Sequence, residues 1–169
     1  MIRTTPIALV MLIALGSGCS RNPAPNLILY CHEGDLTRTD LGDEGPSNGD
    51  LTTWWADVHE VLPESGDPAD SKVVGIASGY NIVTGPLRMM KDGSSHEYRV
   101  SSFHLSFLDS EDDIVWSGIH DYVDSEGPLI NTARRPITGG SGRFVGARGE
   151  SVVTPLGEDW FKVEIFLED

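Results

Sequence analysis

Residues 137–150 read Ile-Thr-Gly-Gly-Ser-Gly-Arg-Phe-Val-Gly-Ala-Arg-Gly-Glu and place five glycines within 11 residues. Strand-forming residues lie on both sides of this stretch. Glycine reaches backbone angles that a β-carbon forbids, so the cluster indicates sharp turns or bulges where two strands meet. A phosphate-binding loop is disfavoured, because no helical pattern follows to supply amide dipoles. The stretch therefore predicts a curved β-structure.

Strand signals fill the rest of the chain. Segments rich in Val, Ile, Phe, Tyr, Trp and Thr alternate with turn clusters, and no convincing helical pattern of ten residues is present. Within 159–168, apolar residues at every second position indicate one dry face and one wetter face. Antiparallel strands of this kind predict an all-β fold, either a closed barrel or a sandwich. The eight predicted strands are 26–33, 51–61, 72–83, 96–108, 113–123, 129–138, 143–154 and 159–168.

The N-terminal residues are typical of an export signal. An apolar run over 7–15 is too short to span a bilayer, and small residues follow it directly before Cys19. This pattern predicts a bacterial lipoprotein that is exported to the cell envelope and anchored through a lipid on Cys19, on the outer membrane if the cell has two. An ordinary secreted protein is the alternative, and a disulfide between Cys19 and Cys31 belongs to that alternative. The predicted organisation is a signal peptide over 1–18, the lipidated cysteine and a tether over 19–26, and one domain over 27–169.

Charge and residue spacing exclude several kinds of partner. The chain has 12 basic and 26 acidic residues, a formal net charge of −14. A nucleic-acid partner needs a positive face, so none is expected, and membrane contact is expected only through the lipid. No histidine pair has the tight spacing of metal ligands, and the acidic run 109–113 lacks the glycine and distal glutamate of a calcium loop. No metal site is predicted.

Five short motifs, in order, resemble the β-barrel superfamily of allene oxide cyclases and plant dirigent proteins. The resemblance implies an eight-stranded antiparallel barrel with a ligand cavity at one mouth. It also implies that the cavity orients a reactive molecule without a metal or an organic cofactor, and that the protein forms a homo-oligomer, a trimer or a dimer. The motifs are residues 27–33, 49–51, 74–80, 116–118 and 137–149.

The resemblance also suggests catalytic residues. The acid of the dirigent first strand is kept as Glu33, and the arginine of the Ala-Arg-Gly element is kept as Arg148. Three allene oxide cyclase positions depart from the family pattern, because Ala56 replaces an asparagine, Asn81 a cysteine and His120 a tyrosine. These departures argue against true allene oxide cyclase activity and leave Glu33, His120 and Arg148 as candidate catalytic groups.

Each candidate has a functional and a structural interpretation. In an apolar barrel the pKa of Glu33 rises and the acid donates a proton near neutral pH, whereas a strand-end acid would pair with Arg148 or be solvated. Because histidine as a residue type titrates near neutrality, His120 and His104 could act as acid–base groups, or they could be partly buried structural residues. Ligand contacts are predicted for Tyr80, Asn81, Trp116 and His104; core or rim packing is the alternative.

Three functions follow from these features. The leading prediction is an exported lipoprotein whose barrel cavity binds a small, mostly apolar molecule. The second is a cofactor-independent cyclase or isomerase, or a dirigent-type protein that steers coupling, using Glu33 with His120 or Arg148. The third is a structural or oligomeric surface protein.

Overall fold

The computed structural model describes residues 24–123, 129 and 131–168. Within these ranges the chain forms β-strands and two short 3-10 turns, over Pro68–Asp70 and Gly142–Phe144, and no α-helix. The strands are β1 (Leu27–Thr39), β2 (Leu51–His59), β3 (Val73–Val83), β4 (Arg88–Met89), β5 (Ser95–Phe107), β6 (Asp113–Val123), β7 (Ala133–Gly140), β8 (Gly149–Gly157) and β9 (Trp160–Leu167).

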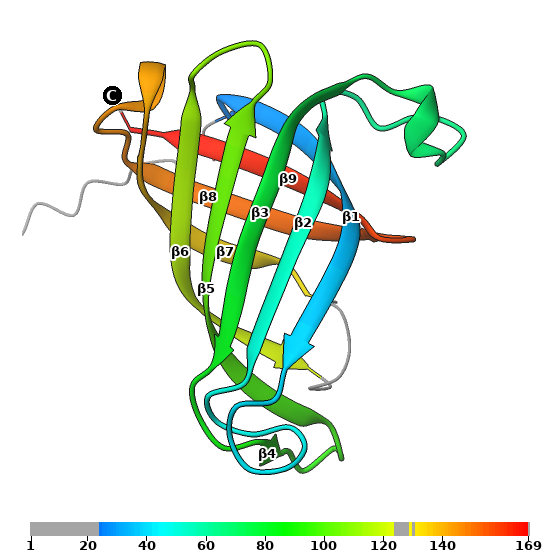
Figure 1. Cartoon of the computed structure of the whole chain (residues 1–169), viewed down its shortest axis with the longest axis vertical. Helices are drawn as coiled ribbons and strands as arrows, with labels where there is room; N and C mark the ends of the chain where they lie inside the picture. Colours follow the sequence, from blue (N-terminus) through cyan, green and yellow to red (C-terminus); the bar gives the residue numbers. More distant parts are fainter. Residues whose placement is uncertain (1–23, 124–128, 130, 169) are drawn as a thin grey trace, which may run out of the picture.

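The strands close into a barrel (Figure 1). The sheet runs in the order β3-β2-β1-β9-β8-β7-β6-β5, and pairing between β3 and β5 joins its two ends. All pairings are antiparallel, and the two-residue β4 adds to β5 outside the ring. The predicted eight-stranded barrel is confirmed, and the sandwich alternative is wrong because closure leaves one continuous sheet.

Strand boundaries differ from the prediction at several places, and the strand predicted over 129–138 spans Ala133–Gly140. The first strand continues to Thr39, past a register shift between Glu33 and Leu36. The strand predicted over 143–154 begins only at Gly149. Its predicted first part is instead a 3-10 turn and a connection, in which Gly142 and Gly146 have positive φ angles of 55° and 78°.

The glycine stretch allows two close backbone approaches. A β-carbon on Gly140 would lie 2.6 Å from Cβ of Phe144 and would also collide with the carbonyl oxygen of Asp113. Gly149 has a φ of 141°, and a β-carbon there would collide with the carbonyl oxygen of Phe166. Both glycines thus let the chain turn tightly against neighbouring strands.

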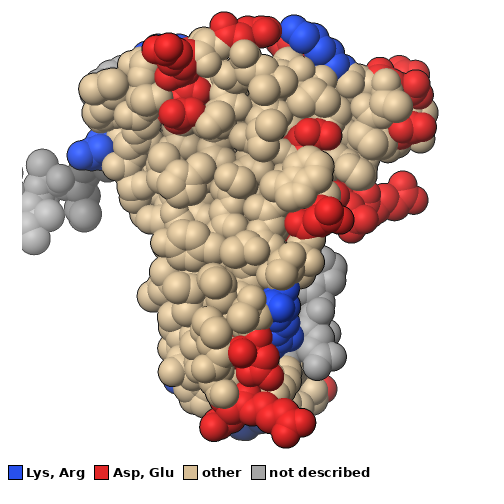
Figure 2. Space-filling view, viewed as in Figure 1, with Lys and Arg blue, Asp and Glu red and all other residues tan. Residues whose placement is uncertain are grey.

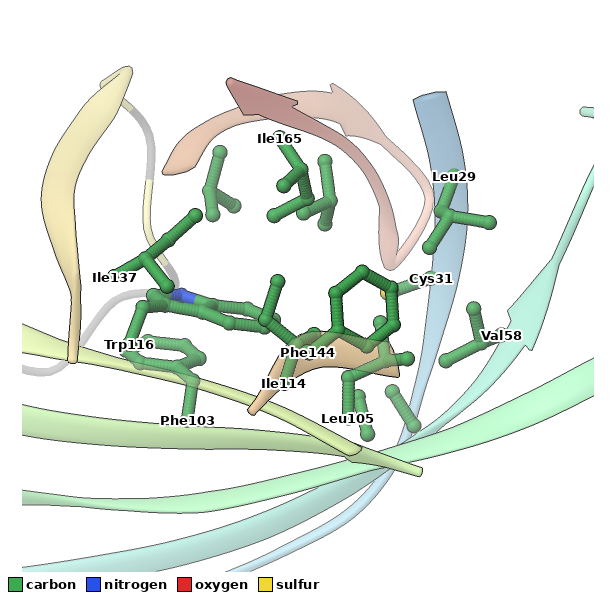
Figure 3. Close-up of a cluster of buried hydrophobic side chains, with 14 residues drawn as sticks. Leu29, Cys31, Val58, Phe103, Leu105, Ile114, Trp116, Ile137, Phe144 and Ile165 are labelled. Atoms are coloured by element: carbon green, nitrogen blue, oxygen red, sulfur yellow. The ribbon is translucent and has the colours of Figure 1, made fainter. Parts of the chain in front are cut away.

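Apolar side chains from most of the strands fill one part of the barrel (Figure 3). Phe103 and Trp116 stack with ring centres 5.6 Å apart, and Phe144 reaches this core from the 3-10 turn. Burial of this surface supplies the main stabilisation of the fold. Other members of the core are Leu29, Cys31, Ala56, Val58, Ala77, Leu105, Ile114, Ile137, Val153, Val163 and Ile165.

Charge is spread unevenly over the outside. Figure 2 shows acidic side chains toward the two ends of the molecule and a broad uncharged area between them. β3, which runs through this face, contains no charged residue. Its outward side chains include the exposed Ile76 and Tyr80.

Candidate ligand cavity

A cavity of about 90 Å³ lies inside the barrel, next to the apolar core. Its lining is mostly apolar and includes Cys31, Ala56, Ala77, Phe103, Trp116 and Val163. Four polar side chains also line it, namely Glu33, Asn81, Arg99 and Tyr122. A cavity of roughly 150 Å³ admits benzene in an engineered protein, so a larger ligand here must move side chains or extend beyond the cavity.

Strand alternation places the polar groups in the barrel interior. In β5, Glu97, Arg99 and Ser101 are buried in phase with Phe103 and Leu105, so their side chains face inward. The Arg99 guanidinium donates to the carboxylate of Glu97. Because both groups are buried, this ion pair is shielded from solvent and fixes the arginine against one wall.

Tyr122 of β6 completes this wall. Its ring lies under the Arg99 guanidinium, 4.2 Å from Cζ to the ring centre. Its hydroxyl is 3.5 Å from Oδ1 of Asn81, at the long end of the hydrogen-bond range. The cavity thus presents a cation, an aromatic ring and an amide to one side of a bound molecule.

Glu33 lies on β1 at the start of the register shift. Burial raises the pKa of its carboxyl, and the negative charge of Asp159 raises it further. Asp159 is close because its carbonyl oxygen accepts a hydrogen bond of 2.9 Å from the Glu33 amide. A carboxyl with a raised pKa at a largely apolar cavity holds its proton to a higher pH and is suited to donate it.

His120 lies in phase with Trp116 and Tyr122 on β6, so its ring faces the same side of the strand. Its Nε2 is 3.1 Å from Oδ1 of Asn131, whose amide group donates to the Asp121 carbonyl. Burial lowers the pKa of His120, and the Asn131 hydrogen bond partly opposes this effect. Burial therefore favours the uncharged form of the ring.

Solved structures with the same architecture include enzymes and a dirigent protein. A pyocyanin demethylase matches with a TM-score of 0.59 at 15% identity, over 84% of this chain and 98% of that one. A pterocarpan synthase dirigent protein matches with a TM-score of 0.58 at 15% identity, over 83% and 82% of the two chains. A Diels-Alderase from Streptomyces koyangensis matches with a TM-score of 0.51 at 19% identity, over 82% of this chain and 65% of that one.

The chain therefore has the same barrel fold as a dirigent protein and a Diels-Alderase. The predicted resemblance is confirmed at the level of the fold. No protein-family model and no curated protein matches the sequence. The fold alone names no ligand, so the function must be argued from the cavity.

The structure separates the predicted site residues into two groups. Glu33, Asn81 and Trp116 line the cavity, and His120 lies close by on the inner face of β6. Ala56, at the position of the cyclase asparagine, also lines the cavity and offers no polar group.

The other predicted residues lie away from the cavity. Tyr80 and His104 are exposed, because their neighbours Asn81 and Phe103 face inward and successive side chains alternate. Arg148 is exposed and donates to backbone carbonyls, including that of Ala147 at 2.9 Å, so it serves the glycine stretch rather than the cavity. Cys19 lies outside the described residues.

Sequence reasoning missed Glu97, Arg99, Tyr122 and Arg135. A signal for two of them was available, since Glu97 and Arg99 are in phase with the apolar face of the segment 96–108. Charged residues are seldom buried, so their residue type predicted exposed side chains. Their positions in the strand alternation predicted side chains that face the barrel interior. Arg135 has the same inward phase in β7, between the buried Ala133 and Ile137.

The described residues contain neither a cluster of metal-ligand side chains nor a membrane-spanning helix. No group of three or more His, Cys, Asp or Glu side chains is arranged to hold a metal ion there. In the same ranges, no helix has the length and apolar character needed to cross a membrane.

Proposed function

We propose that this protein binds a small, mostly apolar molecule in the barrel cavity. The observation that carries the proposal is an internal apolar cavity with a few polar groups on its wall. Ligand sites in proteins typically combine apolar lining with a small number of placed polar groups. Here the apolar part comes from residues such as Ala77 and Phe103, and orientation comes from Asn81, Arg99 and Tyr122.

Filling the cavity tests this proposal. Ala77→Leu places a larger side chain in the lining, whereas Ser78→Leu adds the same group at the exposed neighbouring position. The full-length protein is purified and examined by native mass spectrometry with ligand extraction, then by thermal shift with p-cresol, cinnamate and octanoate. We expect the wild type and Ser78→Leu to retain or bind a small molecule and Ala77→Leu to lose it. Equal behaviour of all three folded proteins, or no binding by any, would refute the proposal.

The proposal includes export and a lipid anchor at Cys19. It is supported by the apolar run over 7–15 and the small residues before that cysteine. Incorporation of labelled palmitate into the full-length chain, and its loss in Cys19→Ala, is the expected result. A chain that takes up no palmitate while it is exported and cleaved would favour an ordinary secreted protein.

A second candidate is a cofactor-independent cyclase or isomerase in which Glu33 donates a proton. The raised pKa of this carboxyl at the cavity favours it. A compound that binds is incubated with the protein, and the products are separated by chromatography with mass detection. An isomerase yields a product of unchanged mass, and Glu33→Gln abolishes its formation while retaining binding. Product formation that persists in Glu33→Gln would exclude this role.

A third candidate is an oligomeric surface protein. The uncharged outer face of β3, with exposed Ile76, supports self-association in a chain of net charge −14. Sedimentation velocity of wild type and Ile76→Glu measures this directly. A trimer or dimer that dissociates in the variant is expected, and a monomeric wild type would exclude it.

A further inference from the structure

Arg135 is an arginine buried inside the barrel. It lies between Ala133 and Ile137 on the inner side of β7 and is 1% exposed, whereas its neighbour Arg134 is exposed. Its guanidinium carbon is 4.5 Å from the centre of the Phe103 ring. Because Phe103 also lines the cavity, one aromatic ring contacts both the guanidinium and the cavity.

Among the described residues, no carboxylate pairs with this guanidinium, and only the Tyr122 side chain offsets the effect of burial on its pKa. Its Nε, Nη1 and Nη2 are all buried and have no hydrogen-bond partner among the described residues. The other arginines of this region are paired, Arg99 with Glu97 in the interior and Arg134 with Glu150 on the outside. Burial lowers the pKa of Arg135, yet a guanidinium stays protonated at neutral pH. An unpaired buried charge is costly, so a compensating anion would stabilise it.

Two more unsatisfied donors lie on the neighbouring strand β6 and on β5, the strand after it in the sheet. Ser101 Oγ and Trp116 Nε1 are buried and have no hydrogen-bond partner in the part of the chain that the structure describes. Ser101 pairs in register with Gly118. A β-carbon added to Gly118 would lie 3.5 Å from Cγ of Arg135, so the arginine stem passes over this glycine. Arg135 and Ser101 therefore lie at the level of Gly118, and Trp116 lies two residues away on β6.

The charges around this level leave an excess of positive charge. Arg99 already engages the buried Glu97. Burial and the charge of Asp159 raise the pKa of the Glu33 carboxyl, which disfavours its negative charge. His120, whose pKa Arg135 helps to lower, supplies no negative charge.

We propose that Arg135, together with Trp116 and Ser101, forms an anion subsite of the cavity and binds the carboxylate of an otherwise apolar ligand. A ligand that displaces the Phe103 ring reaches the guanidinium, which holds the carboxylate by paired N–H donors. This inference rests on the proposed binding function and adds the chemical class of the ligand.

Matched acids and amides test the subsite. Benzoate and cinnamate are compared with benzamide and cinnamamide by isothermal titration calorimetry on the full-length protein. We expect the wild type to bind each acid at least about tenfold more tightly than its amide, because only the acid neutralises the buried charge. Arg135→Met is expected to reduce the preference to about twofold or less. Arg134→Met, which removes an exposed arginine one position away, keeps the tenfold preference.

A second measurement separates this role from a merely structural one. Without ligand, Arg135→Met is expected to raise the melting temperature by about 3 °C, because it removes an uncompensated buried charge. If this variant fails to fold, Arg135→Lys, which keeps the charge, provides the test and must retain at least about a threefold preference for the acids.

The outcomes that overturn the inference are distinct from those that overturn the binding function. Equal binding of acid and amide by the wild type refutes the subsite and leaves cavity binding intact. An unchanged acid preference in folded Arg135→Met does the same. If neither acid nor amide binds the wild type, and the cavity-filling experiment also detects no ligand, both proposals fall.

Discussion

The Arg99 guanidinium lies 4.2 Å above the ring of Tyr122 while it donates to the carboxylate of Glu97. Three side chains from β5 and β6 therefore form one packed polar unit inside the barrel. Each member restricts the others, since the ion pair fixes the guanidinium and the guanidinium covers the ring. A ligand in the cavity would meet this wall in a defined arrangement, which suits orientation of a reactive or polar group.

Glu97→Gln should destabilise the protein strongly. It removes the carboxylate that compensates Arg99 in a site shielded from solvent, and breaking a buried ion pair costs about 3–5 kcal/mol. The free energy of unfolding, measured by chemical denaturation, is expected to fall by about 3 kcal/mol. Glu150→Gln is the control, because its partner Arg134 is exposed and such pairs contribute less than about 1 kcal/mol. Equal losses in the two variants would show that the interior pair is not shielded.

The pKa of Glu33 should make stability depend on pH. Its folded-state pKa is raised by burial and by Asp159, so folding favours the protonated acid. This contribution is fully present below the unfolded-state pKa of about 4.5 and is lost as pH rises through the folded-state value. Glu33→Gln cannot ionise and does not lose this stabilisation. The unfolding free energy of the variant minus that of the wild type should therefore increase between about pH 4 and pH 7.

Two variants control the Glu33 experiment. Glu64→Gln changes an exposed glutamate and should show a pH-independent difference from wild type. Asp159→Asn removes the second cause of the shift and should lower the pKa of Glu33, measured by NMR titration of its carboxyl carbon. A Glu33 pKa at the ordinary glutamate value in the wild type would exclude its proposed role as a proton donor.

The sequence pattern predicted an antiparallel all-β fold because its decisive features are local, whereas the choice of a barrel over a sandwich came from the resemblance of five short motifs. Alternation in 159–168 and in 96–108 reports which side chains face inward, and the glycines of 137–149 report where the backbone must bend. The same alternation explains why Asn81 and Trp116 line the cavity. These properties depend on neighbours in the chain, so they can be predicted without the tertiary structure.

The polar interior was harder to predict because it depends on contacts across strands. Arginine is usually a surface residue, so the type of Arg99 and Arg135 suggests exposure. Only their positions in the strand alternation indicate that they are buried. That Arg99 meets Glu97 while Arg135 meets the ring of Phe103 follows from side-chain packing, which no local pattern specifies. Arg148 was wrongly predicted to be a site residue, because its place in a family motif suggested a catalytic role. Its side chain instead donates to backbone carbonyls.

Cys31 should be inert toward thiol reagents in the folded protein. Burial raises the pKa of its thiol to about 12, so roughly one molecule in ten thousand carries the reactive thiolate at about pH 8. Reaction with Ellman's reagent should be very slow in the native state and fast in concentrated guanidinium chloride. Cys31→Ser combined with Ser78→Cys moves the thiol to an exposed position on β3 and should react quickly without denaturant. Rapid native reaction at Cys31 would mean that the cavity side of β1 opens to solvent.

Gly140→Ala should destabilise the barrel through steric contact alone. The new methyl group would lie 2.6 Å from Cβ of Phe144 and would collide with the carbonyl oxygen of Asp113. Relief requires the 3-10 turn to move away from β6, which withdraws the Phe144 ring from the core. We expect a loss of about 2–3 kcal/mol in the free energy of unfolding.

Gly85→Ala is the matched control for this substitution, because no atom lies within 4 Å of the added β-carbon. Its unfolding free energy should stay within about 1 kcal/mol of wild type, with a gain where alanine restricts the unfolded chain. If Gly140→Ala is as stable as Gly85→Ala, Phe144 does not hold the glycine stretch against the barrel. Phe144→Ala would then cost less than the roughly 3–5 kcal/mol expected for deleting a buried phenylalanine.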